Sequence, residues 1–231
     1  MITRLMSLLA NSADSLIIIF VLLWVLPQAS HLAIFRNIED GFRDPLASTL
    51  HVINLAVLVS GVIVGQVLAV AACSTARGGR GSSLGHALRL AFGRPSVFGV
   101  ALLGSIGWLI GGILFVVPGI FAALTSAVVI AALLDSGQPN SAFRWSSLKG
   151  TWGQVLGASV VLTGAALAFA VLLLIVAAAL RLVIGDALEV LPVGQILAAV
   201  AASVVAGTVA ALGVEIYHSG VRAQVTGAEF E

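Results

Sequence analysis

Long runs of apolar residues, rather than a short helical or strand period, dominate the pattern along this chain. An α-helix rises about 1.5 Å per residue and the hydrocarbon layer of a membrane is about 30 Å thick, so about 20 apolar residues cross it once. Six runs approach or exceed this length, and they predict spans at residues 16–35, 51–76, 97–117, 119–134, 154–180 and 192–217. The pattern therefore predicts an all-α fold: a polytopic transmembrane helical bundle of about six spans, forming one integral membrane domain over residues 1–231.

The first apolar run has two interpretations, a secretory signal peptide or a transmembrane helix. Its apolar residues extend from Leu16 to Leu26 and continue past Pro27 to Phe35, and no small-x-small cleavage pattern follows them. A signal peptide has a shorter apolar region and ends at such a cleavage site. We therefore expect an uncleaved helix.

A Pro-Gly pair interrupts the longest uncharged stretch, which runs from Val97 to Leu134. As one straight helix this stretch would be roughly 57 Å long, far more than one bilayer. The chain must therefore reverse, and we predict a tight helix-hairpin turn at Pro118 and Gly119, because proline cannot continue the preceding helix but suits the first turn of the next. The limb that follows, 119–134, is short, so a re-entrant half-helix is the alternative to a full crossing.

Composition and charge place the chain in a membrane and orient it. Charged residues make up 9% of the chain, against roughly 25% in soluble domains, which leaves too few for the surface of a soluble protein. Eight of the 11 basic residues fall in the termini and connectors that six spans put on one side. Basic residues favour the cytoplasmic side, so both termini are predicted to be cytoplasmic. The net charge of +1 gives no sign of a nucleic-acid partner.

The two connectors on the basic side are predicted to be short amphipathic cytoplasmic helices. In the first, 83–94, a face of leucine, alanine and phenylalanine opposes His86 and Arg89, and Ser82 or Ser83 can cap the start. The second lies within 135–152 and combines tryptophan with flanking cations, which suits a membrane interface. Its candidate interfacial or partner-contact residues are Arg144, Trp145, Leu148, Lys149 and Trp152. Packing of either connector on the protein's own cytoplasmic face is the alternative.

Groups that carry chemistry are sparse and scattered. The four histidines fall on both predicted sides of the membrane without paired spacing, whereas a metal site needs clustered ligands. We therefore expect no metal, no cofactor and no catalytic residue, and predict that the chain is not an enzyme. The deepest strongly polar side chain is Gln66, in the second predicted span. A glutamine at this depth favours a hydrogen bond to another helix over substrate binding.

Small residues recur at the spacing that lets helix backbones approach closely. Internal packing is the favoured interpretation of these pairs, and contacts between protein molecules are the alternative. The pairs are Gly61 and Gly65, Gly107 and Gly111, Gly153 and Gly157, and Ser203 and Gly207.

The order of three segments carries a resemblance to a known family. A basic connector with "SLGHALRLAFGRP" precedes an apolar span, "VVPGIFAAL" follows, and then comes "DSGQPNSAFRWSSLKGTWGQVLG". Over about residues 83–160 this order resembles the integral-membrane domain found beside bacterial glycerophosphoryl diester phosphodiesterases, and related stand-alone, uncharacterised bacterial inner-membrane proteins. The resemblance implies the fold and a place in a bacterial cytoplasmic (inner) membrane. It implies no catalytic residue, because catalysis in the enzyme-bearing members belongs to a separate soluble domain, which residues 1–231 are not expected to contain.

Three functional hypotheses follow from these features. The first is a non-catalytic accessory or scaffold subunit that contacts membrane lipids, other membrane proteins or a second copy of itself. The alternative is a passive or lipid-handling transporter with a polar path near Gln66. An intramembrane enzyme is disfavoured, because convergent ionisable groups are missing from the predicted spans. A deep polar cavity would favour transport, whereas an open apolar groove would favour the accessory function.

Overall fold

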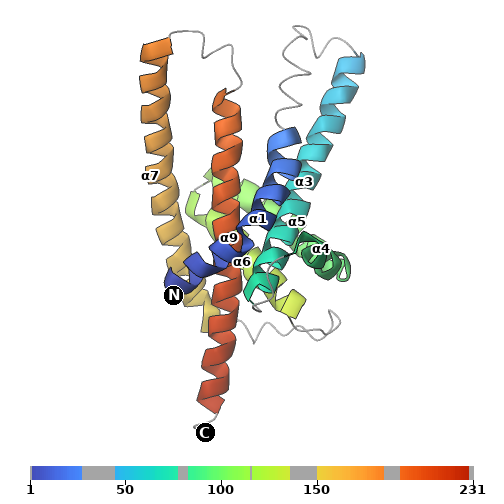
Figure 1. Cartoon of the computed structure of the whole chain (residues 1–231), viewed down its shortest axis with the longest axis vertical. Coiled ribbons are helices and arrows are strands. Elements are labelled where there is room, and N and C mark those ends of the chain that lie inside the picture. The colour runs from blue at the N-terminus through green and yellow to red at the C-terminus, as the bar shows by residue number, and fades with distance from the viewer. Residues whose placement is uncertain are drawn as a thin grey trace.

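The computed structural model describes residues 2–27, 45–77, 83–114, 116–135, 150–184 and 193–228. Helices form all the regular structure in these ranges, and a short π-helical turn, η1 (Val21–Val25), continues the first of them (Figure 1). The α-helices are α1 (Ile2–Phe20), α3 (Pro45–Arg77), α4 (Leu84–Phe92), α5 (Ser96–Leu114), α6 (Val116–Asp135), α7 (Trp152–Ile184) and α9 (Val193–Ala228). The predicted all-α helical bundle is confirmed.

Several of these helices are long and apolar enough to cross a membrane. In the described part of the chain five segments qualify: Ile2–Val25, Val52–Arg77, Val116–Asp135, Trp152–Phe169 and Ala199–Gly220. A sixth is reached if α5 is taken together with α4, from which it is bent by 93°. The chain is therefore a multi-pass membrane protein, with a helix at each of the six predicted segments.

The boundaries of the predicted spans differ most at the two ends of the chain. The span predicted at 16–35 is wrong at its start, because α1 begins at Ile2. The polar residues before Leu16 do not end this helix: Ser12 is buried, and its hydroxyl donates to the carbonyl of Leu8 at 2.8 Å. A hydroxyl that bonds back to its own helix needs no water. At the other end, α9 continues to Ala228, past the predicted end at residue 217. Residues 28–35 and 192 of the predicted spans lie outside the described ranges.

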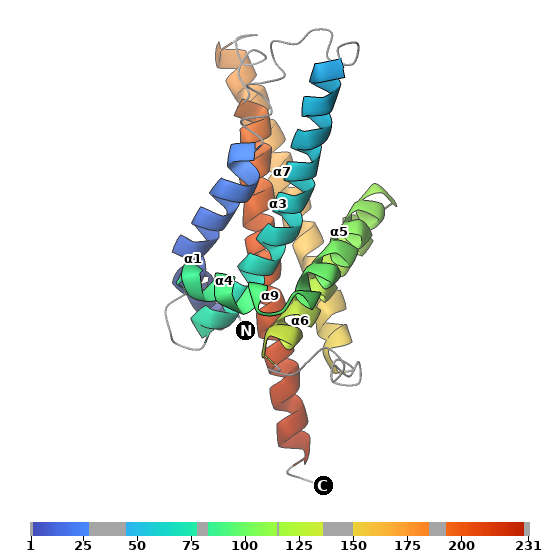
Figure 2. The ribbon, with the colours of Figure 1, turned by 90° about the vertical axis from the view of Figure 1, so that its right-hand side faces the viewer.

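The long helices stand side by side, and the two ends of the chain lie at the same end of the bundle. Figure 1 shows α7 on the outside of α9, with α1 and α3 together on the other flank. Figure 2 shows α4 lying across this end and the α5–α6 hairpin leaning away from α3. We call this end the foot of the bundle; it comprises α4, the C-terminal turns of α3 and α6, the first turn of α7 and α9 near Glu215. The hairpin tip ends below the upper ends of α3 and α7 (Figure 2).

Helices α5 and α6 form the predicted hairpin through three contacts of small residues. An added Cβ at Gly104 would lie 2.4 Å from Ser126 Cβ, one at Gly107 would lie 3.0 Å from Ala122 Cβ, and one at Gly111 would lie 2.6 Å from Gly119 N. Residue numbers rise along α5 while those of the contacted residues fall along α6, so the two helices are antiparallel. Their backbones approach this closely only because glycine has no side chain.

The predicted position of the turn is wrong by a few residues. Helix α5 ends at Leu114 and α6 begins at Val116, so Pro118 and Gly119 already lie in the first turn of α6. Proline is tolerated there because the N–H it lacks has no partner within the helix. Gly119 is buried against Gly111, so this glycine serves the close approach of two helices rather than the reversal. Helix α6 ends at the foot, which is compatible both with a full crossing by residues 119–134 and with a re-entrant half-helix.

The π-helical turn η1 fits α1 against α3. Trp24 Nε1 donates to the carbonyl of Gly61 at 3.2 Å, and an added Cβ at Gly65 would lie 2.7 Å from the same nitrogen. An added Cβ at Gly61 would lie 2.4 Å from the carbonyl oxygen of Leu23. Internal packing is therefore confirmed for the pair Gly61 and Gly65, and η1 has the usual form of a π-helix, a single turn inserted into an α-helix.

Candidate functional site

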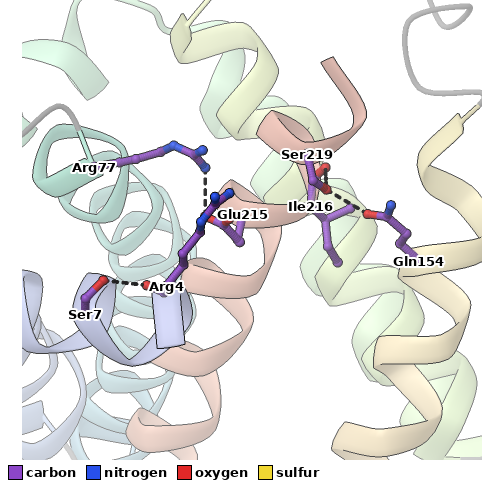
Figure 3. Close-up of polar contacts among 7 residues, drawn as sticks. All are labelled: Arg4, Ser7, Arg77, Gln154, Glu215, Ile216 and Ser219. Atoms are coloured by element: carbon purple, nitrogen blue, oxygen red, sulfur yellow. Dashed lines mark hydrogen bonds and ion pairs between the residues drawn. The ribbon is translucent and has the colours of Figure 1, made fainter. Parts of the chain in front are cut away.

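Polar and charged side chains of the described bundle gather at its foot. The central contact joins the last residue of α3 to α9: Arg77 Nη1 donates to Glu215 Oε2 at 2.8 Å (Figure 3). The two side chains are only 17% and 6% exposed. Two charges removed from water require each other, since either one alone would carry an uncompensated desolvation penalty. In Figure 3 the side chain of Arg4 extends toward the same region from α1.

The C-terminal end of α6 is held by two further contacts. The hydroxyl of Tyr217, on α9, donates to Asp135 Oδ2 at 3.2 Å. Arg94, in the turn between α4 and α5, donates from Nη1 to the carbonyl of Leu133. The last carbonyls of a helix have no intrahelical partner and carry the negative end of its dipole, so a guanidinium caps them favourably.

A third set of contacts fastens α7 to α9. The hydroxyl of Ser219 donates to Gln154 Oε1 at 2.8 Å, and Ser219 also lies 2.9 Å from the carbonyl of Ile216 (Figure 3). An added Cβ at Gly220 would lie 2.4 Å from Thr151 Cγ2. The foot thus ties α3, α6, α7 and α9 together by polar contacts. Among the described residues it contains no group of three metal-ligating side chains.

Gln66 bonds across to another helix at membrane depth. Its Nε2 donates to Ser126 Oγ on α6 at 2.7 Å, and the Ser126 hydroxyl donates in turn to the carbonyl of Ala123 at 2.8 Å. Gln66 is half-buried. Its position matches the predicted helix-to-helix bond, and the amide that was the candidate for a polar path is engaged in packing α3 on α6.

The first predicted connector helix is present as α4. Ser83 caps its start: the backbone N–H of His86 donates to Ser83 Oγ at 3.2 Å. Ala87 and Ala91 are buried, whereas His86 and Arg89 are exposed on the other side. The predicted amphipathic helix and its cap are found, but Phe92, which the sequence places on the apolar face, is 61% exposed.

The second predicted connector lies mostly outside the described ranges. Arg144, Trp145, Leu148 and Lys149 belong to that part of the chain, and their grouping stays a prediction. Trp152 is described and is the first residue of α7, and its role as an interfacial contact stays a prediction. Its ring stacks on Phe121 of α6, with centroids 6.2 Å apart and an interplanar angle of 28°, and 36% of the residue remains exposed.

An open apolar groove lies between η1 and α3, away from the foot. Its volume is about 470 Å³ and its lining is largely aliphatic. The lining residues are Leu22, Leu23, Pro27, Ile53, Ala56, Val57, Ser60, Gly61 and Val64. The groove offers contacts to an apolar chain or helix and no charged group for a polar substrate.

The pairs at the foot were missed by sequence reasoning. The partners are far apart in the sequence, and no spacing rule relates them. One signal was available: with an even number of crossings between them, Arg77 and Glu215 fall at the same end of the bundle. The order of the spans gives the end of the bundle at which a residue lies. It does not give which faces of two helices meet.

Comparisons with models of protein families, with curated proteins and with solved structures found no match. The resemblance to the membrane domain found beside glycerophosphoryl diester phosphodiesterases therefore stays a prediction.

Proposed function

We propose that this chain is a non-catalytic accessory or scaffold subunit of a bacterial cytoplasmic membrane, acting through contacts with lipids or other membrane proteins. The observation that carries the proposal is the uncovered face of α7. In the described part of the chain, 17% of the Trp152–Phe169 span is buried, against 33% to 61% of the other four candidate spans. A helix with so little internal packing offers most of its surface to the surroundings.

Glycines on this helix support contact with another protein. An added Cβ at Gly153, Gly157 or Gly164 would meet nothing within 4 Å, unlike the close contacts at Gly61 and Gly111. Glycine in a helix interior lowers helix stability by about 0.5–1 kcal/mol relative to alanine, with no gain from packing within the chain. A second helix approaching this face would supply that gain.

The polar groups support the same proposal from the opposite direction. Gln66 is bonded to Ser126 and Glu215 to Arg77, so both are explained by contacts between helices. The groove between η1 and α3 is apolar. A transporter with a polar path near Gln66 remains the alternative hypothesis, and no contact of Gln66 favours it.

Replacing Gly157 with leucine tests the proposal. We expect the variant to fold as the wild type does, because the new side chain points into open space, but to lose assembly with a partner helix. Cross-linking in native membranes, followed by native gel electrophoresis in mild detergent, measures this loss. Gly99→Leu is the matched control, since an added Cβ at Gly99 also meets nothing within 4 Å. A wild-type chain that migrates alone, or equal assembly of wild type and Gly157→Leu, would argue against α7 as the contact.

Orientation is tested by labelling two single cysteines from opposite sides. We propose that the foot is cytoplasmic, on the strength of the basic residues predicted there. Helix α3 begins at Pro45 and ends at Arg77. Residue 44 precedes it and residue 82 comes after it, so the two are predicted to lie on opposite sides of the membrane. In a Cys73→Ala background, Asp44→Cys should react with a membrane-impermeant maleimide in intact cells, and Ser82→Cys only after lysis. Labelling of both in intact cells would refute the topology.

A further inference from the structure

Helix α4 lies at the foot with a fixed orientation. It makes an angle of 93° with α5, so if α5 crosses the membrane, α4 runs nearly parallel to its surface (Figure 2). Ala87 and Ala91 are fully buried, and Arg94 anchors the following turn to the end of α6. The outward face of α4 is therefore held in place by the packing of its inner face and by the bond of the turn that follows it.

The outward face of α4 is basic. The segment 77–94 contains four arginines and no acidic residue. Two of the four are engaged inside the protein, Arg77 with Glu215 and Arg94 with the carbonyl of Leu133. Arg89 is exposed and makes no hydrogen bond or ion pair with any residue that the structure describes. His86, one turn earlier, is exposed beside it.

An aromatic residue borders this basic face next to the start of α5. Phe92 is 61% exposed and lies one turn after Arg89, so the two side chains are neighbours on the helix surface. Its ring contacts that of Phe98, near the start of α5, with centroids 5.3 Å apart. The exposed residues on α4 thus combine an imidazole, a guanidinium and a phenyl ring, and a helix that lies in a membrane interface uses cationic side chains for headgroups and apolar ones for the upper acyl chains.

We propose that α4 binds anionic phospholipids, with the lipid phosphate at Arg89 and His86 and the upper acyl chain against Phe92. Charge complementarity selects this occupant: the exposed guanidinium of Arg89 faces no acidic side chain of its own helix, and the surface of the cytoplasmic leaflet is negative. A guanidinium donates two parallel hydrogen bonds to phosphate oxygens. The proposal deepens the proposed function by naming a lipid class, and it rests on the foot being at the membrane surface.

The test measures binding of short-chain phosphatidylglycerol to the full chain in mild detergent, with the matching phosphatidylcholine as the zwitterionic probe. We expect Arg89→Gln to raise the Kd for phosphatidylglycerol about fivefold, from the usual contribution of one basic residue near an anionic surface. Its Kd for phosphatidylcholine should rise less, because the choline ammonium cancels the net negative charge that Arg89 attracts, and Arg89→Lys should retain most of the affinity. Phe92→Ala should weaken the binding of both lipids by a similar factor, because both have acyl chains. A site that binds free phosphate would not depend on Phe92.

Arg4→Gln is the matched control, because it removes the same charge from an exposed side chain on a different helix, α1. It should leave the Kd for phosphatidylglycerol unchanged, and Arg89→Gln should keep the wild-type melting temperature without added lipid. Equal binding of the two lipids by the wild type, no effect of Arg89→Gln, or an equal effect of Arg4→Gln would each overturn the proposal. These outcomes are independent of Gly157→Leu, so a failure here is distinguishable from a failure of the proposed function.

Discussion

Replacing Glu215 with alanine is expected to lower the free energy of unfolding by about 3–5 kcal/mol, because it leaves a largely buried guanidinium without its counter-charge. The Arg77 Nη1 to Glu215 Oε2 distance is 2.8 Å, and the side chains are 17% and 6% exposed, so water replaces the lost partner only in part. The pair also joins α3 to α9, two helices that are distant in sequence. Unfolding of the full chain in mixed micelles with increasing denaturing detergent, followed by circular dichroism, measures the loss.

The double variant Arg77→Met with Glu215→Leu is the matched control. It removes both charges and keeps apolar volume in their place, so most of the lost stability should return. If the double variant is as unstable as Glu215→Ala, the loss does not come from an uncompensated charge. Wild-type stability of Glu215→Ala would show that the pair does not hold the foot together.

Replacing Gly111 with valine is expected to destabilise the α5–α6 hairpin by about 1–3 kcal/mol, the usual range for overpacking. An added Cβ would lie 2.6 Å from Gly119 N and 2.8 Å from the carbonyl carbon of Pro118. These are backbone atoms, which cannot rotate away as the end of a side chain can, so the two helices must separate. The same unfolding assay measures the effect.

Gly99→Val is the control for that substitution. Gly99 lies on the same helix and is exposed, and an added Cβ there meets nothing within 4 Å. The change in helix propensity is the same at both sites, so the difference between the two variants isolates the contact with α6. Equal stability of the two variants would contradict a close approach at Gly111.

The helices themselves could be predicted well because their signals are local. The apolar runs mark each crossing, and a serine before an amphipathic stretch marks the start of α4, where Ser83 is the cap. The start of α1 was missed, since Ser12 satisfies its hydroxyl within its own helix and so does not behave as a boundary. The hairpin turn was misplaced, since Pro118 and Gly119 are suited both to a turn and to the first turn of a helix.

The candidate site could be predicted only in part. A helix-to-helix bond was expected for Gln66, but its partner Ser126 follows from the packing of α3 on α6. The pairs Gly107 with Gly111 and Gly153 with Gly157 have the same spacing in the sequence, yet the first packs against α6 and the second meets nothing. Spacing shows that a face is smooth, but only the arrangement of the other helices decides whether that face is covered.

By itself, the sequence determined that this chain is an all-α, multi-pass membrane protein with an amphipathic helix between two of its spans. These properties depend on the transfer of each segment from water to hydrocarbon, which is a sum over neighbouring residues. The tertiary structure alone decided that Arg77 meets Glu215, that Gly119 packs on Gly111, and that one face of α7 is left open. Those properties depend on how helices rotate and approach within the bundle, which hydropathy does not specify, because packing and individual polar contacts set it once the segments are in the membrane.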